Sequence, residues 1–182
     1  MTMTMSRPTR LDAQAFPFQQ AGMTVTERQP QRLRLADATY QVTLQFRVRR
    51  MLLGRISQLQ AGAIVPTARG PEQPCVLELK VTGSKERRFQ WKPSSDEASP
   101  LTSPLTGPAL AALVQAVDLT SCTVTWSPQH KEWRICVEPY AAAHLRVFFP
   151  PINYNMAVTQ SEAGLIVNAI GELANLLHTD AA

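Results

Sequence analysis

The chain has 182 residues, of which 45% are hydrophobic and 18% charged, with a formal net charge of +4 and a pI near 9.3. This composition excludes a disordered chain, and so small a net charge disfavours a dedicated nucleic-acid binder. No stretch approaches the ~18 continuous apolar residues of a membrane span, and the start of the sequence shows no secretory signal. We therefore expect a cytoplasmic protein that folds as a single domain over residues 1–182.

The charge is unevenly distributed along the chain. The first sixty residues hold nine arginines, no lysine and three acidic residues, whereas residues 61–182 hold nine basic and eleven acidic residues. The arginine guanidinium is planar, always charged and suited to phosphate and carboxylate groups. This asymmetry is the feature of the sequence that points most clearly to a partner.

In the N-terminal third, residues 1–10 are expected to form a flexible tail, and residues 11–23 fit either a short helix or an extended cover strand. Residues 32–35 alternate arginine with leucine, which is typical of a half-buried strand. A longer alternation follows in residues 40–49 and predicts a strand with one polar face. Its apolar positions are Tyr40, Val42, Leu44, Phe46 and Val48.

The middle of the chain is less regular. Residues 51–60 have apolar side chains at helical spacing, but Gly54 favours a bulge between strands, and both interpretations stay open. Residues 75–82 and 87–92 predict a hairpin. The segment 93–108, with four prolines and four serines, predicts a flexible loop, with a lid or a peptide ligand for another domain as the sharper alternative.

The C-terminal half predicts two helices separated by strands. The first helix is expected near 108–119, a hairpin joins 120–126 to 132–138, and a further strand covers 144–149. The second helix is amphipathic and is expected near 160–178, opened by a capping box in which Thr159 and Glu162 satisfy each other's backbone donors. Its apolar stripe predicts packing on the sheet, with Glu172 on the opposite, polar face.

Together these elements predict an α+β fold with a largely antiparallel sheet of about seven to nine strands, the mid-chain helix, and the C-terminal helix packed on the sheet. The order of elements suits a helix on a curved sheet with a cavity between them. A pleckstrin-like barrel capped by a helix is the alternative.

Motifs for catalysis or metal binding are missing from the sequence. The three histidines His130, His144 and His178 have no partner at metal-ligand spacing, and there is no phosphate-binding glycine loop. We therefore predict no catalytic residue, no metal and no cofactor, while a site assembled from distant residues stays an alternative.

Four arginines form the candidate anion site. Arg47 and Arg49 point to one side of their strand, and Arg32 and Arg34 do the same on the preceding strand. If the two strands pair across a turn at 37–39, all four guanidiniums share one sheet face. A solvated face whose arginines pair with glutamates is the alternative, and the aromatic side chains of this strand lie on the opposite face, which disfavours nucleic acid.

Two cysteines are a possible redox pair. If Trp126 lies opposite Glu132 in the second hairpin, Cys122 and Cys136 are also directly opposed and within reach of a disulfide. A shift of one residue in the register removes this contact, and two buried reduced thiols are the alternative.

The sequence thus favours a non-catalytic, cytoplasmic binding domain. It would engage an anionic small molecule or an acidic protein surface through the arginine face, or a small ligand in a cavity under the C-terminal helix. The alternatives are a small enzyme built around that cavity and an oligomerising or adaptor protein.

Overall fold

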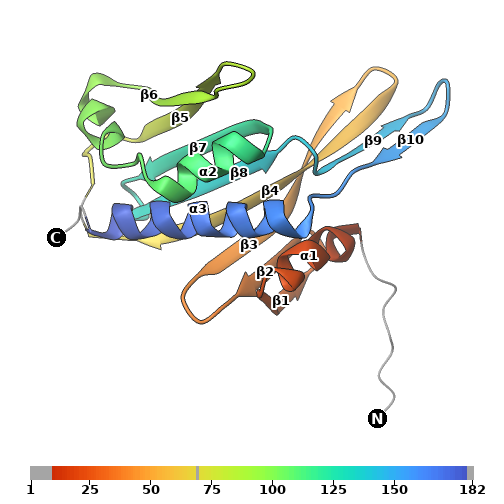
Figure 1. Ribbon diagram of the computed structural model, residues 1–182, viewed down its shortest axis with the longest axis horizontal. Helices are drawn as coiled ribbons and strands as arrows, with labels where there is room; N and C mark the ends of the chain where they lie inside the picture. The colour runs from red at the N-terminus through yellow and green to blue at the C-terminus, as the bar shows by residue number, and fades with distance from the viewer. Residues whose placement is uncertain (1–9, 69, 180–182) are drawn as a thin grey trace, which may run out of the picture.

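The computed structural model describes residues 10–68 and 70–179 (Figure 1). Within them, ten strands form one antiparallel sheet, accompanied by three α-helices and one 3₁₀-helix. The predicted α+β fold is confirmed. The helices are α1 (Arg10–Gln20), η1 (Asp96–Thr102), α2 (Pro108–Ala116) and α3 (Gln160–Thr179). The strands are β1 (Thr24–Gln29), β2 (Arg32–Ala36), β3 (Gln41–Met51), β4 (Gly54–Pro66), β5 (Cys75–Thr82), β6 (Arg88–Pro93), β7 (Leu119–Ser127), β8 (Glu132–Pro139), β9 (Ala143–Val147) and β10 (Ile152–Asn155).

The sheet is organised around β4. The strand order is β1-β2-β3-β4-β8-β7-β5-β6, and β9 and β10 extend the sheet beside the first half of β4. On one edge β4 pairs with β3, and on the other it pairs with β9 over Gly54–Gln58 and with β8 over Ala61–Pro66. The segment 51–60, which residue spacing left ambiguous, is therefore a hairpin turn followed by the start of this central strand.

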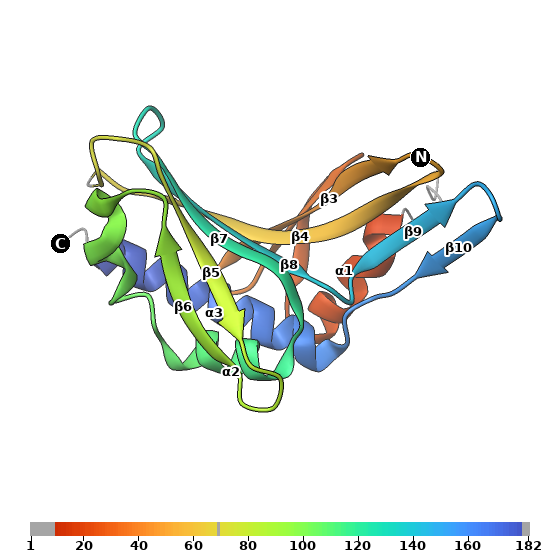
Figure 2. The same cartoon turned by 90° about the horizontal axis from the view of Figure 1, so that it is seen from above.

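All three α-helices lie on one face of the sheet (Figure 2). Alternation along the strands turns side chains such as Leu44 and Leu59 toward the helices, where Ile166 and Ile170 of α3 are fully buried. The segment 11–23, which fitted either a helix or a strand, forms helix α1 and buries Phe18. The opposite face of the sheet carries mostly polar side chains.

The proline- and serine-rich segment 93–108, predicted as a flexible loop, covers part of the core and contains more regular structure than its composition predicted. It contains η1, and its Ala98 and Leu105 are fully buried. The Trp91 indole N–H donates to the Leu105 carbonyl oxygen at 2.9 Å. Because a buried indole needs an acceptor, this bond ties the segment to β6. The tail prediction for residues 1–10 lies outside the described residues except at Arg10, which begins α1.

Two glutamates accept hydrogen bonds from free backbone N–H groups at the N-termini of α3 and α2. The predicted capping box is confirmed, since the Thr159 N–H donates to Glu162 at 2.7 Å and the Glu162 N–H donates to the Thr159 hydroxyl oxygen at 3.2 Å. Glu172, predicted on the polar face of its helix, accepts the N–H groups of Ala109 and Leu110 at 3.2 and 3.0 Å, at the start of α2. A side chain on α3 thus caps α2 and fixes the two helices to each other.

We expect Glu172→Ala to lower the free energy of unfolding by about 1 kcal/mol, because two N-terminal amides of α2 lose their acceptor. Urea denaturation measures this change. Asn168→Ala, an exposed position on the same helix, is the control and should shift stability by less than about 0.5 kcal/mol. Equal effects of the two substitutions would contradict the capping role.

Candidate functional site

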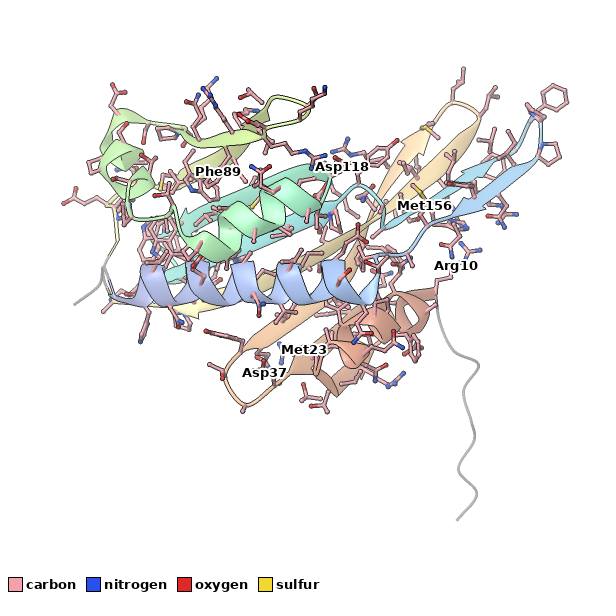
Figure 3. All side chains as sticks on the ribbon, viewed as in Figure 1. Arg10, Met23, Asp37, Phe89, Asp118 and Met156 are labelled. Carbon is pink, nitrogen blue, oxygen red and sulfur yellow. The ribbon has the colours of Figure 1, made fainter. Side chains whose placement is uncertain are left out.

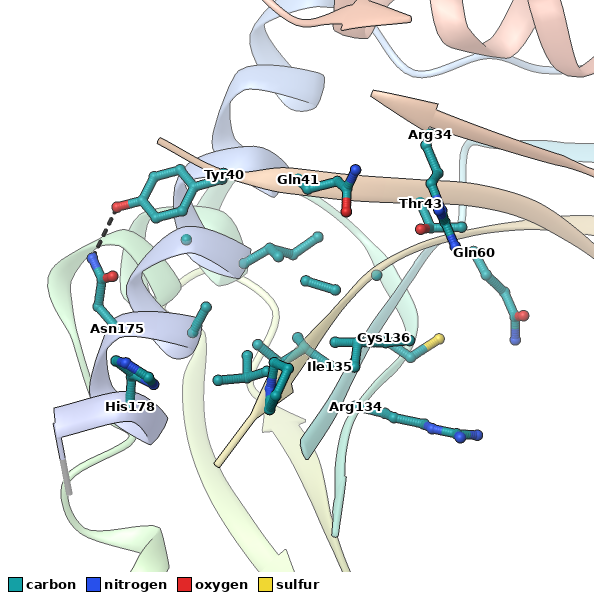
Figure 4. A pocket seen from close by; sticks show the side chains of 18 of the residues that line it. Arg34, Tyr40, Gln41, Thr43, Gln60, Arg134, Ile135, Cys136, Asn175 and His178 are labelled. Atoms are coloured by element: carbon teal, nitrogen blue, oxygen red, sulfur yellow. Dashed lines mark hydrogen bonds between the residues drawn. The ribbon is translucent and has the colours of Figure 1, made fainter. Parts of the chain in front are cut away.

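A cleft opens where β3 and β4 separate. Their last pair is Thr43 with Gly62, after which β3 stays with β2 while β4 continues beside β8 to Pro66. The space between them has a volume of about 620 Å³ and is bordered by the C-terminal half of α3 (Figure 4). The cleft therefore joins the polar face of the sheet to the helix side.

The polar wall of the cleft is positively charged. Arg32 and Arg34 of β2 and Arg134 of β8 line it, together with uncharged polar side chains, and no acidic residue lines it within the described ranges 10–68 and 70–179. Arg34 pairs with Glu27 and Arg134 with Glu132, both at 2.7 Å, from outside the cleft. Among the described residues Arg32 makes no ion pair, so its charge is available to a ligand.

The opposite wall comes from the helix side and combines apolar residues with Asn175 and His178. Ile170 and Ala174 of α3 line it, as does Tyr40, which directly precedes β3. The Asn175 amide donates to the Tyr40 hydroxyl oxygen at 2.9 Å (Figure 4). The Tyr40 ring packs so closely on Gly171 that a Cβ there would lie 2.5 Å from Cε2 of the ring. The absence of a side chain at this position allows the turn before β3 to rest on α3.

The structure places the four arginines of the predicted anion site on one sheet face, but brings only two of them to the cleft. The turn at Asp37 forms (Figure 3), with its carboxylate accepting the N–H groups of Thr39 and Tyr40, each at 2.7 Å. The β2–β3 register then places Arg32, Arg34, Arg47 and Arg49 on one sheet face. Two of the four, Arg32 and Arg34, line the cleft, whereas Arg47 and Arg49 lie further along β3.

Arg47 is bound to a buried carboxylate. It donates to Glu138 at 3.2 Å, and the Glu138 side chain is 2% exposed. Gln60 donates to the same carboxylate oxygen at 2.7 Å and accepts a hydrogen bond from Gln45 at 2.9 Å. This chain of hydrogen bonds connects Arg47 to two glutamines that line the cleft, so Arg47 orders the floor of the cleft and does not contact its contents.

Sequence reasoning missed Arg134 and the residues of α3 that complete the cleft. Arg134 is two residues from both Glu132 and Cys136 on β8, so the three side chains are predicted to share one face of the strand. This spacing does not predict which strands lie beside β8. The pairing of β8 with β4 brings Arg134 opposite Ile64 at the mouth of the cleft. That pairing joins segments about seventy residues apart and leaves no local signal in the sequence.

Residues 17–177 match the model of a family described as a protein of unknown function, DUF3156. The chain belongs to this family. No curated protein and no solved structure matches the chain. None of the helices in the described part of the chain is both long and apolar enough to cross a membrane.

The register of the β7–β8 hairpin differs by one residue from the register that would oppose the two cysteines. Trp126 pairs with Trp133, with ring centroids 5.0 Å apart, so Cys122 lies opposite Val137 and Cys136 opposite Thr123. The two tryptophans share the apolar face, where their tilted contact buries both rings. Cys122 and Cys136 therefore point to opposite faces, and the proposed redox pair is wrong for this register.

The thiols are kept neutral by their surroundings. Burial raises the pKa of Cys122 to about 12, and burial together with the nearby Glu138 carboxylate raises the pKa of Cys136 to about 11. Since the thiolate is the reactive form, both groups are poor nucleophiles at neutral pH.

The histidines do not converge. His178 lines the cleft, His130 lies in the β7–β8 turn, and His144 is buried at the start of β9. Burial and the Arg10 guanidinium lower the pKa of His144. No group of three or more potential metal ligands occurs among the described residues.

Substitution of Arg47 should affect stability, and substitution of Arg49 should not. We expect Arg47→Ala to lower the free energy of unfolding by about 1–2 kcal/mol, because a buried acceptor loses a donor. Arg49→Ala, two residues along the same strand face, should change it by less than about 0.5 kcal/mol. Urea denaturation of both variants is the measurement, and a neutral Arg47→Ala would refute the structural role.

Thiol titration tests the register of the β7–β8 hairpin. After treatment of the folded protein with diamide and subsequent unfolding in guanidinium chloride, we expect all three cysteines to react with Ellman's reagent. The reason is that Cys122 and Cys136 lie on opposite faces of the hairpin. A loss of two thiols would show that an intramolecular disulfide forms.

Proposed function

We propose that this chain is a binding domain whose cleft holds a small ligand with an anionic group and an apolar part. The observation that carries the proposal is the composition of the cleft walls. Among the residues that the structure describes, three arginines and no acidic residue stand on one side, and α3 contributes apolar surface together with Asn175 and His178 on the other. Such a combination of charge and apolar surface suits a carboxylate or phosphate attached to a hydrocarbon group.

Arg32 is the principal contact for the anion in this proposal. Arg34 and Arg134 already share their charge with Glu27 and Glu132, whereas Arg32 has no acidic partner within the described residues. An anion between Arg32 and its neighbours would accept charge-assisted hydrogen bonds, the stronger kind in proteins. The apolar part of the ligand would lie against Ala174 and the Tyr40 ring, both of which are partly exposed.

The proposed ligand joins the two modes of binding expected from the sequence. The arginine-bearing face and the space beside the C-terminal helix meet in one cleft. A cytoplasmic location stays part of the proposal, and the odd number of cysteines supports a reducing compartment.

Four probes separate the two contributions to binding. Decanoate and decyl phosphate carry both an anionic and an apolar part, decanol lacks the charge, and inorganic phosphate lacks the chain. We expect the first two to raise the melting temperature and the last two to have little effect, because a ligand stabilises the state that binds it. Equal shifts from decanol would contradict a role for the arginines.

Two substitutions locate the binding site. By isothermal titration calorimetry, Arg32→Gln should weaken decanoate binding about tenfold, through loss of a charge-assisted hydrogen bond. Ala174→Phe should abolish it by filling the apolar wall. Arg88→Gln on β6 and Asn168→Phe on the exposed side of α3 are the matched controls and should bind like the unmodified protein. Unchanged affinity in both cleft variants would refute the proposal.

A further inference from the structure

Two neighbouring hairpins project from the body of the protein as an arm. We define the arm as residues 47–57 of the β3–β4 hairpin and residues 143–155 of the β9–β10 hairpin. It extends past the helices at one end of the sheet (Figures 1 and 2). The hairpins are joined by the pairing of β4 with β9 and by the Phe148 N–H, which donates to the Leu53 carbonyl oxygen at 2.8 Å. They therefore form one continuous part of the sheet.

The tip of the arm exposes large apolar side chains. Leu52 is 98% and Phe149 75% exposed, and Leu53 and Phe148 beside them are more than half exposed. Both turns contribute to this group of four, which we call the tip. An exposed apolar cluster formed by two adjacent turns lowers the solubility of a protein, and such clusters mark interaction surfaces.

The arm is cationic directly behind the tip. It contains five arginines and no acidic residue. Three of them stand side by side across neighbouring strands, because Arg50 pairs with Arg55 and Arg55 pairs with Arg146. Like charges directly opposite each other destabilise a sheet. A bound anion would relieve this repulsion, so the row is arranged for anionic groups from outside the chain.

The spacing of charge and apolar surface matches a lipid interface. Leu52, at the start of the turn, follows Arg50 by two positions, so the two residues lie within roughly 7 Å of each other along the chain. The Arg146 guanidinium lies 5.6 Å from the centroid of the Phe148 ring, which holds a positive charge at the base of the tip. Peripheral proteins bury apolar side chains about 5–10 Å into the headgroup and acyl boundary while basic groups contact the phosphates.

We propose that the arm docks tip-first on an anionic lipid surface. The four apolar side chains of the tip enter the headgroup and acyl boundary, and Arg50, Arg55 and Arg146 contact lipid phosphates. A second copy fits less well, because two arms meeting at their tips would bring two rows of arginines, each made of Arg50, Arg55 and Arg146, together. Nucleic acid would engage the arginines but leave Leu52 and Phe149 in water.

Vesicle co-sedimentation tests the docking with the full chain. We expect binding to vesicles of equal parts phosphatidylcholine and phosphatidylglycerol, weakening as salt is added, and little binding to phosphatidylcholine alone. Absence of binding to the anionic vesicles at low salt overturns the proposal. So does equal binding to both lipids.

Matched variants separate the tip from general charge. Leu52→Ser with Phe149→Ser should lower the partition coefficient at least tenfold, and Arg50→Gln and Arg146→Gln about fivefold each. Val81→Thr and Arg88→Gln, on the β5–β6 hairpin at the other end of the sheet, should leave it unchanged. Because the altered side chains of the tip are exposed, the melting temperature should stay constant. Equal losses in arm and control variants would show nonspecific adsorption and overturn the proposal.

A fluorescent substitution distinguishes insertion from adsorption. Trp91, Trp126 and Trp133 are buried, so a tryptophan introduced by Phe149→Trp reports on the tip. Its emission should shift to the blue with anionic vesicles and be quenched by brominated acyl chains. Lack of quenching overturns insertion. Sedimentation velocity without lipid completes the test: a dimer that Leu52→Ser dissociates would assign the tip to a second copy.

Discussion

The hydrogen bonding of one long strand determines the shape of this molecule. β4 presents backbone hydrogen-bonding groups on both edges, and no neighbour pairs with its whole length, since even β3 leaves it after Gly62. β8 pairs with its second half and β9 with its first, and the chain crosses between them in a short turn at 140–142. There Gln58, buried on β4, donates to the Ala142 carbonyl oxygen at 3.3 Å, and the Leu59 N–H donates to the same oxygen at 2.8 Å. The cleft and the arm both follow from this arrangement, because each begins where a neighbour leaves β4.

Local patterns in the sequence predicted the helices, strands and turns well, but they did not predict which strands lie side by side in the sheet. The alternation in residues 40–49 and the capping box at Thr159 each depend on a few consecutive residues, and both are confirmed. The hairpin at Asp37 could also be predicted from the sequence, since the residues that favour a turn are close together in the chain. By contrast, the strand order around β4 joins distant segments, and no periodicity encodes it.

Errors arose where a burial requirement overrode a local preference. The segment 93–108 has the composition of a loop but is held in place because the Trp91 indole needs an acceptor. The β7–β8 register is set by the two tryptophans, whose rings bury more apolar area together than a cysteine pair would. The candidate site was accordingly half predictable: Arg32 and Arg34 follow from strand alternation, whereas Arg134 and the α3 wall require the sheet order.

The shared strand β3 has a consequence for how the cleft and the arm communicate. Thr43 of β3 lies opposite Arg34, and Arg50 in the arm is seven positions further along the same strand. This corresponds to a distance of about 23 Å along the strand. The Debye length at physiological ionic strength is about 8 Å. The two cationic regions are therefore screened from each other, and an anion held in one contributes almost nothing to the potential at the other. Any influence between them must travel mechanically, as a change in the twist of the β3–β4 pair.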